Sequence, residues 1–305
     1  MDWTVYWFML PVCVLIATEA MFSGISGAAL LTPTFLIGFP LFSIPRLTTV
    51  AAIGTSLFLE TSGFGTGLYR YLRMRLVDLK AAKALILITL PLGALGAIVA
   101  RHVPAEVLRI GYGVAMLGLA GLLLRDKPGG KAAEGDPAPA VVCESDTSHP
   151  PCGLGEQREV RAANGKVYSY CAHGLRLQRV LSGGGAFVAG LISTGVGEST
   201  LPALVQRSRF SVPVAAATST VVVAGTVAGA ATTHLVQLVI EGGLSAIPWN
   251  LLVWAVPGSI IGAFMGTRLQ GRVSERASRL FFAGLFAAIG VAFLLAFTVF
   301  VRLFG

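Results

Sequence analysis

Apolar residues dominate this chain in long continuous runs, instead of the alternating or 3.6-residue patterns of soluble domains. A helix that crosses a membrane needs about 20 consecutive, mostly apolar residues. Runs of roughly this length or longer follow one another at 4–38, 47–69, 80–100, 104–124, 180–206, 212–240, 248–267 and 277–301. The pattern predicts an all-α integral membrane protein that crosses the bilayer several times.

Composition supports this interpretation. The 305 residues are 54% hydrophobic and only 12% charged, whereas soluble domains carry roughly 25% charged residues. The net charge of +8 would suggest nucleic-acid binding in a soluble protein, but here the basic residues lie at the ends of the apolar runs. Such residues orient helices in a membrane, so the lipid bilayer is the expected partner and nucleic acid is not.

The apolar sequence contains an internal repeat. Three blocks recur in the same order in both halves. The first is Ser23-Gly-Ile-Ser-Gly27 followed by Pro33, which matches Ser193-Thr-Gly-Val-Gly197 followed by Pro202. The second is Ala52-Ile-Gly-Thr-Ser56, which matches Ala215-Ala-Ala-Thr-Ser219, and the third is Pro91-Leu-Gly-Ala-Leu-Gly-Ala97, which matches Pro257-Gly-Ser-Ile-Ile-Gly-Ala263. We therefore expect two transmembrane repeats, at 1–124 and 180–305, separated by a polar insert at 125–179.

Each repeat opens with a segment that glycine and proline interrupt. Glycine costs about 1 kcal/mol and proline about 3 kcal/mol in a helix interior. Irregular backbone at membrane depth is tolerated only where it is buried in protein or lines a wet cavity. Two interpretations follow: a re-entrant hairpin that returns to its side of entry, or a kinked helix that spans the membrane.

The distribution of the 23 Lys and Arg residues favours re-entrant hairpins. With hairpins, one face of the membrane carries only Arg46, Arg101, Arg109 and Arg302, and the other carries the remaining basic residues together with the insert. The positive-inside rule then predicts a cytoplasmic insert and both termini outside the inner membrane. Each repeat keeps about three full spans, an odd number, so the repeats should be inverted, an architecture typical of secondary transporters.

The same blocks resemble the sulfite exporter TauE/SafE family. The resemblance rests on a glycine-rich break followed by proline, an A-x-x-T-S block and a Gly-Ala helix, all duplicated across the insert. It implies a membrane permease that exports small sulfur-containing anions, such as sulfite or the sulfonate sulfoacetate. The alternative from another class is an intramembrane enzyme or sensor that uses the insert. The sequence contains no P-loop and no nucleophile elbow, so we expect a carrier and not an enzyme.

Broken helices supply groups that bind anions without a basic side chain, because their N-terminal N–H groups are unpaired and carry a partial positive charge. The breaks and the A-x-x-T-S blocks contribute hydroxyl and backbone donors. The expected substrate-binding residues are Ser23, Ser26, Gly27, Thr55, Ser56, Ser193, Thr194, Gly197, Ser199, Thr218 and Ser219. The alternative is that these small residues let helices pack closely and bond their own backbone.

Ionisable residues inside apolar runs are costly and indicate function by default. Glu198 lies in the second break and is the best candidate to bind a coupling proton, and Glu60 lies one turn after Thr55-Ser56 and could act with it. Glu19 and His234 are weaker candidates.

The polar insert predicts a β-hairpin around Asn164-Gly165, because this dipeptide is typical of hairpin turns. Weak zinc candidates surround it, and they are Cys143, Cys152, Cys171 and His173. Free thiols are the default in a reducing cytoplasm, so we expect no cofactor. The glycines at 258, 262 and 266 are typical of close helix packing, within one protomer or in a homodimer.

Overall fold

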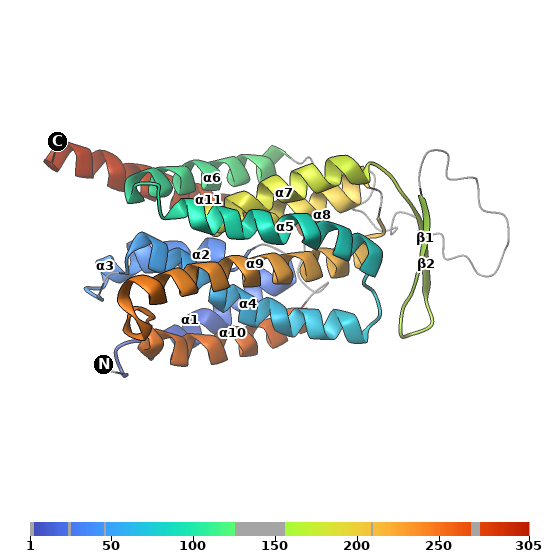
Figure 1. Cartoon of the computed structure of the whole chain (residues 1–305), viewed down its shortest axis with the longest axis horizontal. Helices are drawn as coiled ribbons and strands as arrows, with labels where there is room; N and C mark the ends of the chain where they lie inside the picture. The colour runs from blue at the N-terminus through green and yellow to red at the C-terminus, as the bar shows by residue number, and fades with distance from the viewer. Residues whose placement is uncertain are drawn as a thin grey trace.

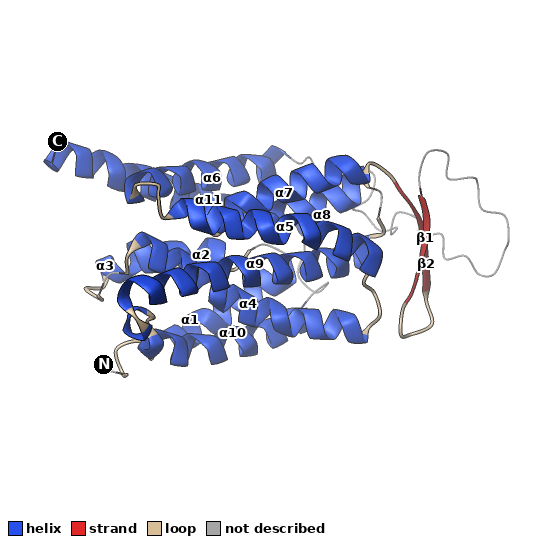
Figure 2. Cartoon of the chain, viewed as in Figure 1, coloured by secondary structure: helices blue, strands red, loops and turns tan. Residues whose placement is uncertain are grey.

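The computed structural model of the protein describes residues 3–23, 26–45, 47–125, 156–208, 210–269 and 275–304. Helices form one bundle, whose long axis is horizontal in Figure 1. A two-stranded hairpin lies beyond one end of the bundle (Figure 2), and we call this the hairpin end. Both chain ends lie at the opposite end of the bundle, which we call the terminal end.

Each half contributes a short broken segment and three long helices. The first half consists of α1 (Met9–Ser23), α2 (Ala28–Pro33), the π-helical turn η1 (Thr34–Gly38), α3 (Phe39–Leu41), α4 (Thr49–Arg73), α5 (Leu79–Ala100) and α6 (Ala105–Arg125). The second consists of α7 (Leu175–Ile192), α8 (Val196–Pro202), the π-helical turn η2 (Ala203–Arg207), α9 (Val212–Gly242), the 3₁₀ turn η3 (Leu244–Ala246), α10 (Trp249–Leu269) and α11 (Glu275–Phe304).

Four stretches of the described residues are long and apolar enough to cross a membrane. They are Leu79–Ala100, Ala105–Leu124, Pro213–Gly242 and Trp249–Arg268. The expected all-α membrane fold is confirmed.

The broken segment of each half turns back on itself. α1 has 15 residues, fewer than the roughly 20 that a spanning helix needs. α3 lies beside the residues that precede α1, as the stacking of the Phe39 ring on the Tyr6 ring shows, with centroids 5.5 Å apart. In the second half, the His173 N–H before α7 donates to the Ser208 carbonyl after η2, at 3.3 Å. Both segments therefore fold back on themselves, as the re-entrant interpretation expects, and we call them the re-entrant segments.

Each returning arm contains a π-helical turn directly after a proline. Pro33 precedes η1, and Pro202 precedes η2. Proline has no N–H, and its ring displaces the carbonyl four residues earlier, so the regular ladder of hydrogen bonds is interrupted there. The same irregularity at the same place in both halves fits the internal duplication in the sequence.

Helices of the two halves pack in a pattern that is unchanged when the halves are exchanged. α1 packs on α10 and α7 on α5, α4 packs on α9 and α6 on α11, and the α5–α9 contact matches the α4–α10 contact. Gly262 of α10 lies against the Val14 carbonyl of α1, and Gly96 of α5 lies against the Phe187 carbonyl of α7, both too closely for a β-carbon. The glycine stripe thus packs helices within one chain.

The hairpin lies at the position that the sequence predicts. β1 (Glu156–Arg161) and β2 (Val167–Ala172) pair antiparallel, and the connecting turn contains Asn164 and Gly165. Gly165 has φ +83°, a left-handed conformation that favours glycine.

Asp78, the residue before α5, fastens the hairpin to the bundle. Arg158 donates to its carboxylate at 2.7 Å, and the Tyr170 hydroxyl donates to the same oxygen at 2.8 Å. Its other oxygen accepts the Ala81 N–H and caps α5. Burial alone would raise the pKa of Asp78, but the hydrogen bonds from Ala81, Arg158 and Tyr170 outweigh burial and hold this pKa below its ordinary value.

Apolar contacts join the hairpin to the exit of the second re-entrant segment. The Tyr170 ring packs on the Phe210 ring with centroids 4.6 Å apart, and Val160 shares one buried cluster with Leu204 of η2. The two strands are therefore part of the packed structure of the bundle end.

Candidate functional site

The two re-entrant segments meet at the side chain of Glu198, and we call this meeting point the centre. Glu198 lies in the first turn of α8, and its Oε2 accepts the N–H of Gly195 at 3.1 Å. Its Oε1 accepts the N–H of Ser26 at 3.1 Å, across 172 residues of sequence. Gly195 directly precedes α8, and Ser26 lies just before α2. One carboxylate is thus held by backbone donors from both breaks.

The local sequence explains this geometry. The first N–H groups of a helix have no partner within the helix, so a side chain or a ligand must satisfy them. Glu198 is the third residue of α8 and reaches back to the N–H of the capping residue. Gly195 has φ +128°, a conformation that L side chains rarely adopt, which accounts for glycine at this turn.

A chain of buried hydroxyl groups links the second break to α2 and α4. Thr32 Oγ1 donates to Ser56 Oγ at 2.8 Å and lies 2.6 Å from Ser193 Oγ. Ser56 in turn donates to the Ala52 carbonyl at 2.7 Å. All three hydroxyl residues are buried, and Ser193 adopts a left-handed conformation with φ 61°. The structure therefore brings Ser56 and Ser193 together, and it does so through Thr32.

Glu60 of α4 is a second carboxylate in this region. It is 4% exposed, and neither of its oxygens has a hydrogen-bond partner among the described residues. The Ser26 hydroxyl and the N–H groups of Gly27 and Ala28 approach it without reaching hydrogen-bonding geometry. The start of α2 thus faces Glu60 on one side, while the Ser26 N–H binds Glu198.

Two functional candidates escaped the sequence reasoning. Thr32 precedes Pro33 inside the first broken segment, and that position was the available signal. Tyr112 of α6 is 2% exposed, donates to the Ala29 carbonyl at 2.6 Å and lies within the electrostatic influence of Glu60 and Glu198. A lone phenol in the apolar run 104–124 was the only indication.

A narrow cavity of about 20 Å³ opens beside Glu60. Its lining residues include Gly27, which directly precedes α2, Phe64 of α4, Cys13 of α1 and Ser259 of α10. A water molecule needs roughly 10–15 Å³ of such space, so this cavity is too small for a polyatomic anion. The space between the two breaks is instead filled by protein side chains, the Glu198 carboxylate among them.

The remaining predicted residues have different surroundings. Thr218 accepts the backbone N–H of Asp78 at 3.1 Å, at the start of α5, and Ser199 donates to the Val196 carbonyl of its own helix. Thr55 and Thr194 are buried, and neither hydroxyl has a hydrogen-bond partner among the described residues. Gly197 and Ser219 are also buried, and Ser23 ends α1 with its side chain outside the described set.

The weaker candidates Glu19 and His234 and the four weak zinc candidates form no part of the contacts described above. Glu19 lies on α1 and is partly exposed. His234 is buried, and its Nε2 lies 2.9 Å from the Gly190 carbonyl, a contact between α9 and α7. Cys143 and Cys152 lie outside the described residues, Cys171 is on β2, and His173 follows that strand. Within the described part of the chain, no three residues of metal-binding type come together.

Comparison with known proteins gives one match. The sequence model of the family described as "Sulfite exporter TauE/SafE" matches residues 9–293, almost the whole chain. Neither a curated protein nor a solved structure matches the chain.

Proposed function

Because the chain belongs to the sulfite exporter TauE/SafE family, we propose that it is a secondary carrier that exports sulfite or a small sulfonate such as sulfoacetate. The family implies a membrane protein that exports a sulfur-containing anion. The choice of substrate and the residues that bind it are our proposal.

The observation that carries the proposal is the position of the Glu198 carboxylate. It accepts the N–H groups of Ser26 and Gly195, one from each re-entrant segment. A carboxylate and a sulfonate both present negatively charged oxygens to such donors, and hydrogen bonds to charged oxygens are stronger than neutral ones. Glu198 therefore occupies the place that we assign to the substrate, and substrate binding requires this carboxylate to leave.

Proton binding offers a way to free the site. A protonated Glu198 is a weaker acceptor for the two N–H groups and no longer repels an anion. Glu60 lies nearby without a hydrogen-bond partner among the described residues, so its ionised form would add to the repulsion. We assign both residues to coupling, with anion and proton binding together at the centre. The hydroxyls of Ser26, Ser193, Thr194 and Thr55 would complete the coordination of the anion.

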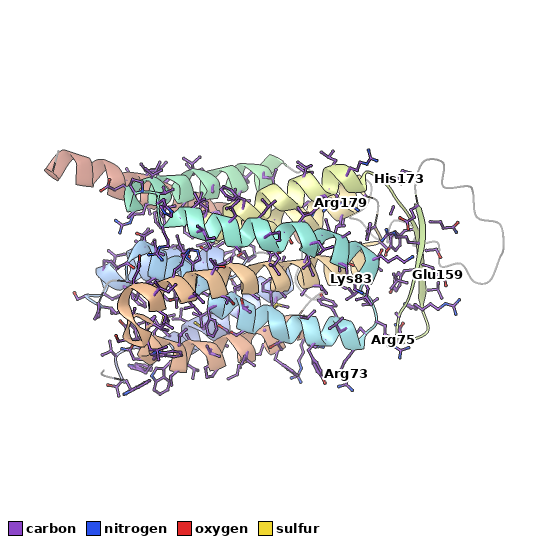
Figure 3. All side chains as sticks on the ribbon, viewed as in Figure 1. Arg73, Arg75, Lys83, Glu159, His173 and Arg179 are labelled. Atoms are coloured by element: carbon purple, nitrogen blue, oxygen red, sulfur yellow. The ribbon has the colours of Figure 1, made fainter. Side chains whose placement is uncertain are left out.

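The orientation of the bundle belongs to the proposal as well. α1 begins at the terminal end and α7 begins at the hairpin end, which supports inverted repeats (Figure 1). Arg73, Arg75, Lys83 and Arg179 lie toward the hairpin end (Figure 3), and the positive-inside rule favours the cytoplasm for such an end. The insert would then be cytoplasmic, with both termini outside the inner membrane.

Uptake into proteoliposomes tests the proposal. We would compare sulfite, sulfoacetate, taurine and sulfate between about pH 5 and 8, in the wild type and in Glu198→Gln. The wild type should transport sulfite or sulfoacetate, with a rate that depends on pH. Glu198→Gln removes the charge at nearly constant shape, so transport should lose most of its pH dependence.

Glu241→Gln is the matched control, because this glutamate is 59% exposed and pairs with Arg101 far from the centre. It should behave like the wild type. A pH profile in Glu198→Gln identical to that of the wild type contradicts the coupling role. Failure of the folded wild type to move any of the four anions contradicts the assigned substrate class.

A further inference from the structure

Three arginines line an open cleft where α4 and α10 lie side by side near the hairpin end. The cleft has a volume of about 350 Å³, and it is lined by Tyr69, Arg70, Arg73, Met74, Phe264 and Arg268. Arg73 marks this region in Figure 3. The cleft shares no lining residue with the cavity beside Glu60.

Aromatic rings hold the three guanidinium groups in place. Arg70 and Arg268 both lie over the Phe264 ring, with Cζ atoms 5.6 and 5.1 Å from its centroid. Arg73 lies over the Tyr69 ring at 5.7 Å and donates to its hydroxyl at 3.4 Å. Two of the cations thus share a single ring, although like charges repel each other.

This positive charge has no acidic partner among the described residues. Their ion pairs join Arg101, Arg158 and Arg161 to acids elsewhere, and none includes Arg70, Arg73 or Arg268. α10 contains no Asp or Glu at all. The one acid of α4 is Glu60, which is buried and lies ten residues, or about 15 Å of helix, before Arg70. Within the described residues, the positive charge of the cleft is therefore left for an external anion to balance.

The surroundings of the cleft indicate the kind of anion. Apolar side chains near the arginines are nearly half exposed, with Leu72 at 46%, Met74 at 43%, Ile261 at 47% and Met265 at 47%. A water-soluble anion makes no use of this surface, whereas a lipid covers it with its acyl chains. Basic clefts between helices at a membrane surface are suited to anionic lipid headgroups.

We propose that this cleft binds the headgroup of an anionic phospholipid. The guanidinium groups of Arg73 and Arg268 bind the phosphate oxygens, and Arg70, which also donates to the Thr267 hydroxyl, orients the site from within the cleft. The acyl chains lie along the exposed apolar faces of α4 and α10.

The test measures lipid binding to the purified, delipidated full chain. Native mass spectrometry would titrate phosphatidylglycerol, phosphatidylcholine and inorganic phosphate separately. The wild type should bind phosphatidylglycerol and should bind the zwitterionic lipid and free phosphate far more weakly. A cationic side chain near an anionic membrane surface is worth about fivefold in affinity, so Arg73→Gln with Arg268→Gln should weaken phosphatidylglycerol binding roughly 25-fold.

Lys80→Gln with Lys83→Gln is the matched control, because it removes two exposed charges of α5 that lie outside the cleft. This variant should bind phosphatidylglycerol within about twofold of the wild type. Equal binding by the arginine variant and the wild type overturns the proposal. Binding of free phosphate as tight as that of the lipid also overturns it, since the cleft would then be a site for soluble anions.

Discussion

Replacing Asp78 with alanine should detach the hairpin from the bundle at a large cost in stability. The Asp78 side chain is 6% exposed and the Arg158 side chain 12%, so the substitution leaves a nearly buried cation without its main partner. Loss of one partner from a buried pair costs about 3–5 kcal/mol. Glu156 also contacts Arg158 at 2.9 Å and offsets part of this loss. We therefore take the lower value, about 3 kcal/mol, as the cost of leaving Arg158 without Asp78.

A second contribution comes from the helix that Asp78 caps. Loss of the bond from the Ala81 N–H costs roughly 1 kcal/mol more. The expected decrease in the free energy of unfolding is therefore about 4 kcal/mol. Arg158→Met added to Asp78→Ala should recover part of it, because the unpaired cation is then gone.

The same carboxylate predicts how this contribution changes with pH. The folded-state pKa of Asp78 lies below its ordinary value of 3.8, so the folded state binds the proton less readily than the unfolded state. The stabilisation is then fully present above about pH 4 and is lost as the pH falls through the lowered pKa. Between pH 5 and 8 the difference between the wild type and Asp78→Ala should stay constant.

Reversible unfolding in mixed detergent micelles, followed by far-UV circular dichroism, measures these differences. Glu159→Ala is the control on the same hairpin, because Glu159 pairs with Arg161 at side-chain exposures of 47% and 79%. An exposed pair contributes at most about 1 kcal/mol. The reasoning is refuted if Asp78→Ala destabilises the protein no more than Glu159→Ala does.

Two further substitutions probe the packing of the bundle. Thr32→Val keeps the shape of the side chain but removes the hydroxyl between Ser56 and Ser193. It should lower the free energy of unfolding by about 1–3 kcal/mol in the same assay. An unchanged stability contradicts the hydroxyl chain. Gly262→Leu places a side chain against the backbone of α1, so this variant should aggregate in size-exclusion chromatography. Gly65 has open space around its α-carbon, so the control Gly65→Leu should stay monodisperse. Equal elution of the two variants contradicts the close helix contact.

Much of the fold could be predicted because the relevant signals are local. Gly195 and Pro202 interrupt a helix wherever it packs, so the second break was visible in the sequence. The hairpin around Asn164-Gly165 depends on a short stretch of residues, and it forms where expected. The stripe at Gly262 required a partner helix, and the structure supplies α1.

The composition of the centre could be predicted only in part. Glu198 was identified as a candidate because a carboxylate in an apolar run is unusual, but its bond to Ser26 depends on how two hairpin tips meet across 172 residues. Thr218 looked equivalent to Thr55 in the sequence, yet it accepts the Asp78 N–H, because the choice of hydroxyl partner depends on helix register. The attachment of the hairpin at Asp78 gave no signal, since Arg158 and Tyr170 come from the insert.

The exchange of the two halves preserves the backbone pattern but not the charge. The first turn of α8 carries Glu198, whereas that of α2 carries no acid, and Glu60 of α4 corresponds by the Thr-Ser blocks to Val223 of α9. In a carrier whose inward-open and outward-open forms interchange the roles of its halves, identical halves would make those forms equal in free energy. Here each carboxylate stays with one half, so for the proposed carrier we expect a resting population biased toward one form, and we expect proton concentration to alter that bias.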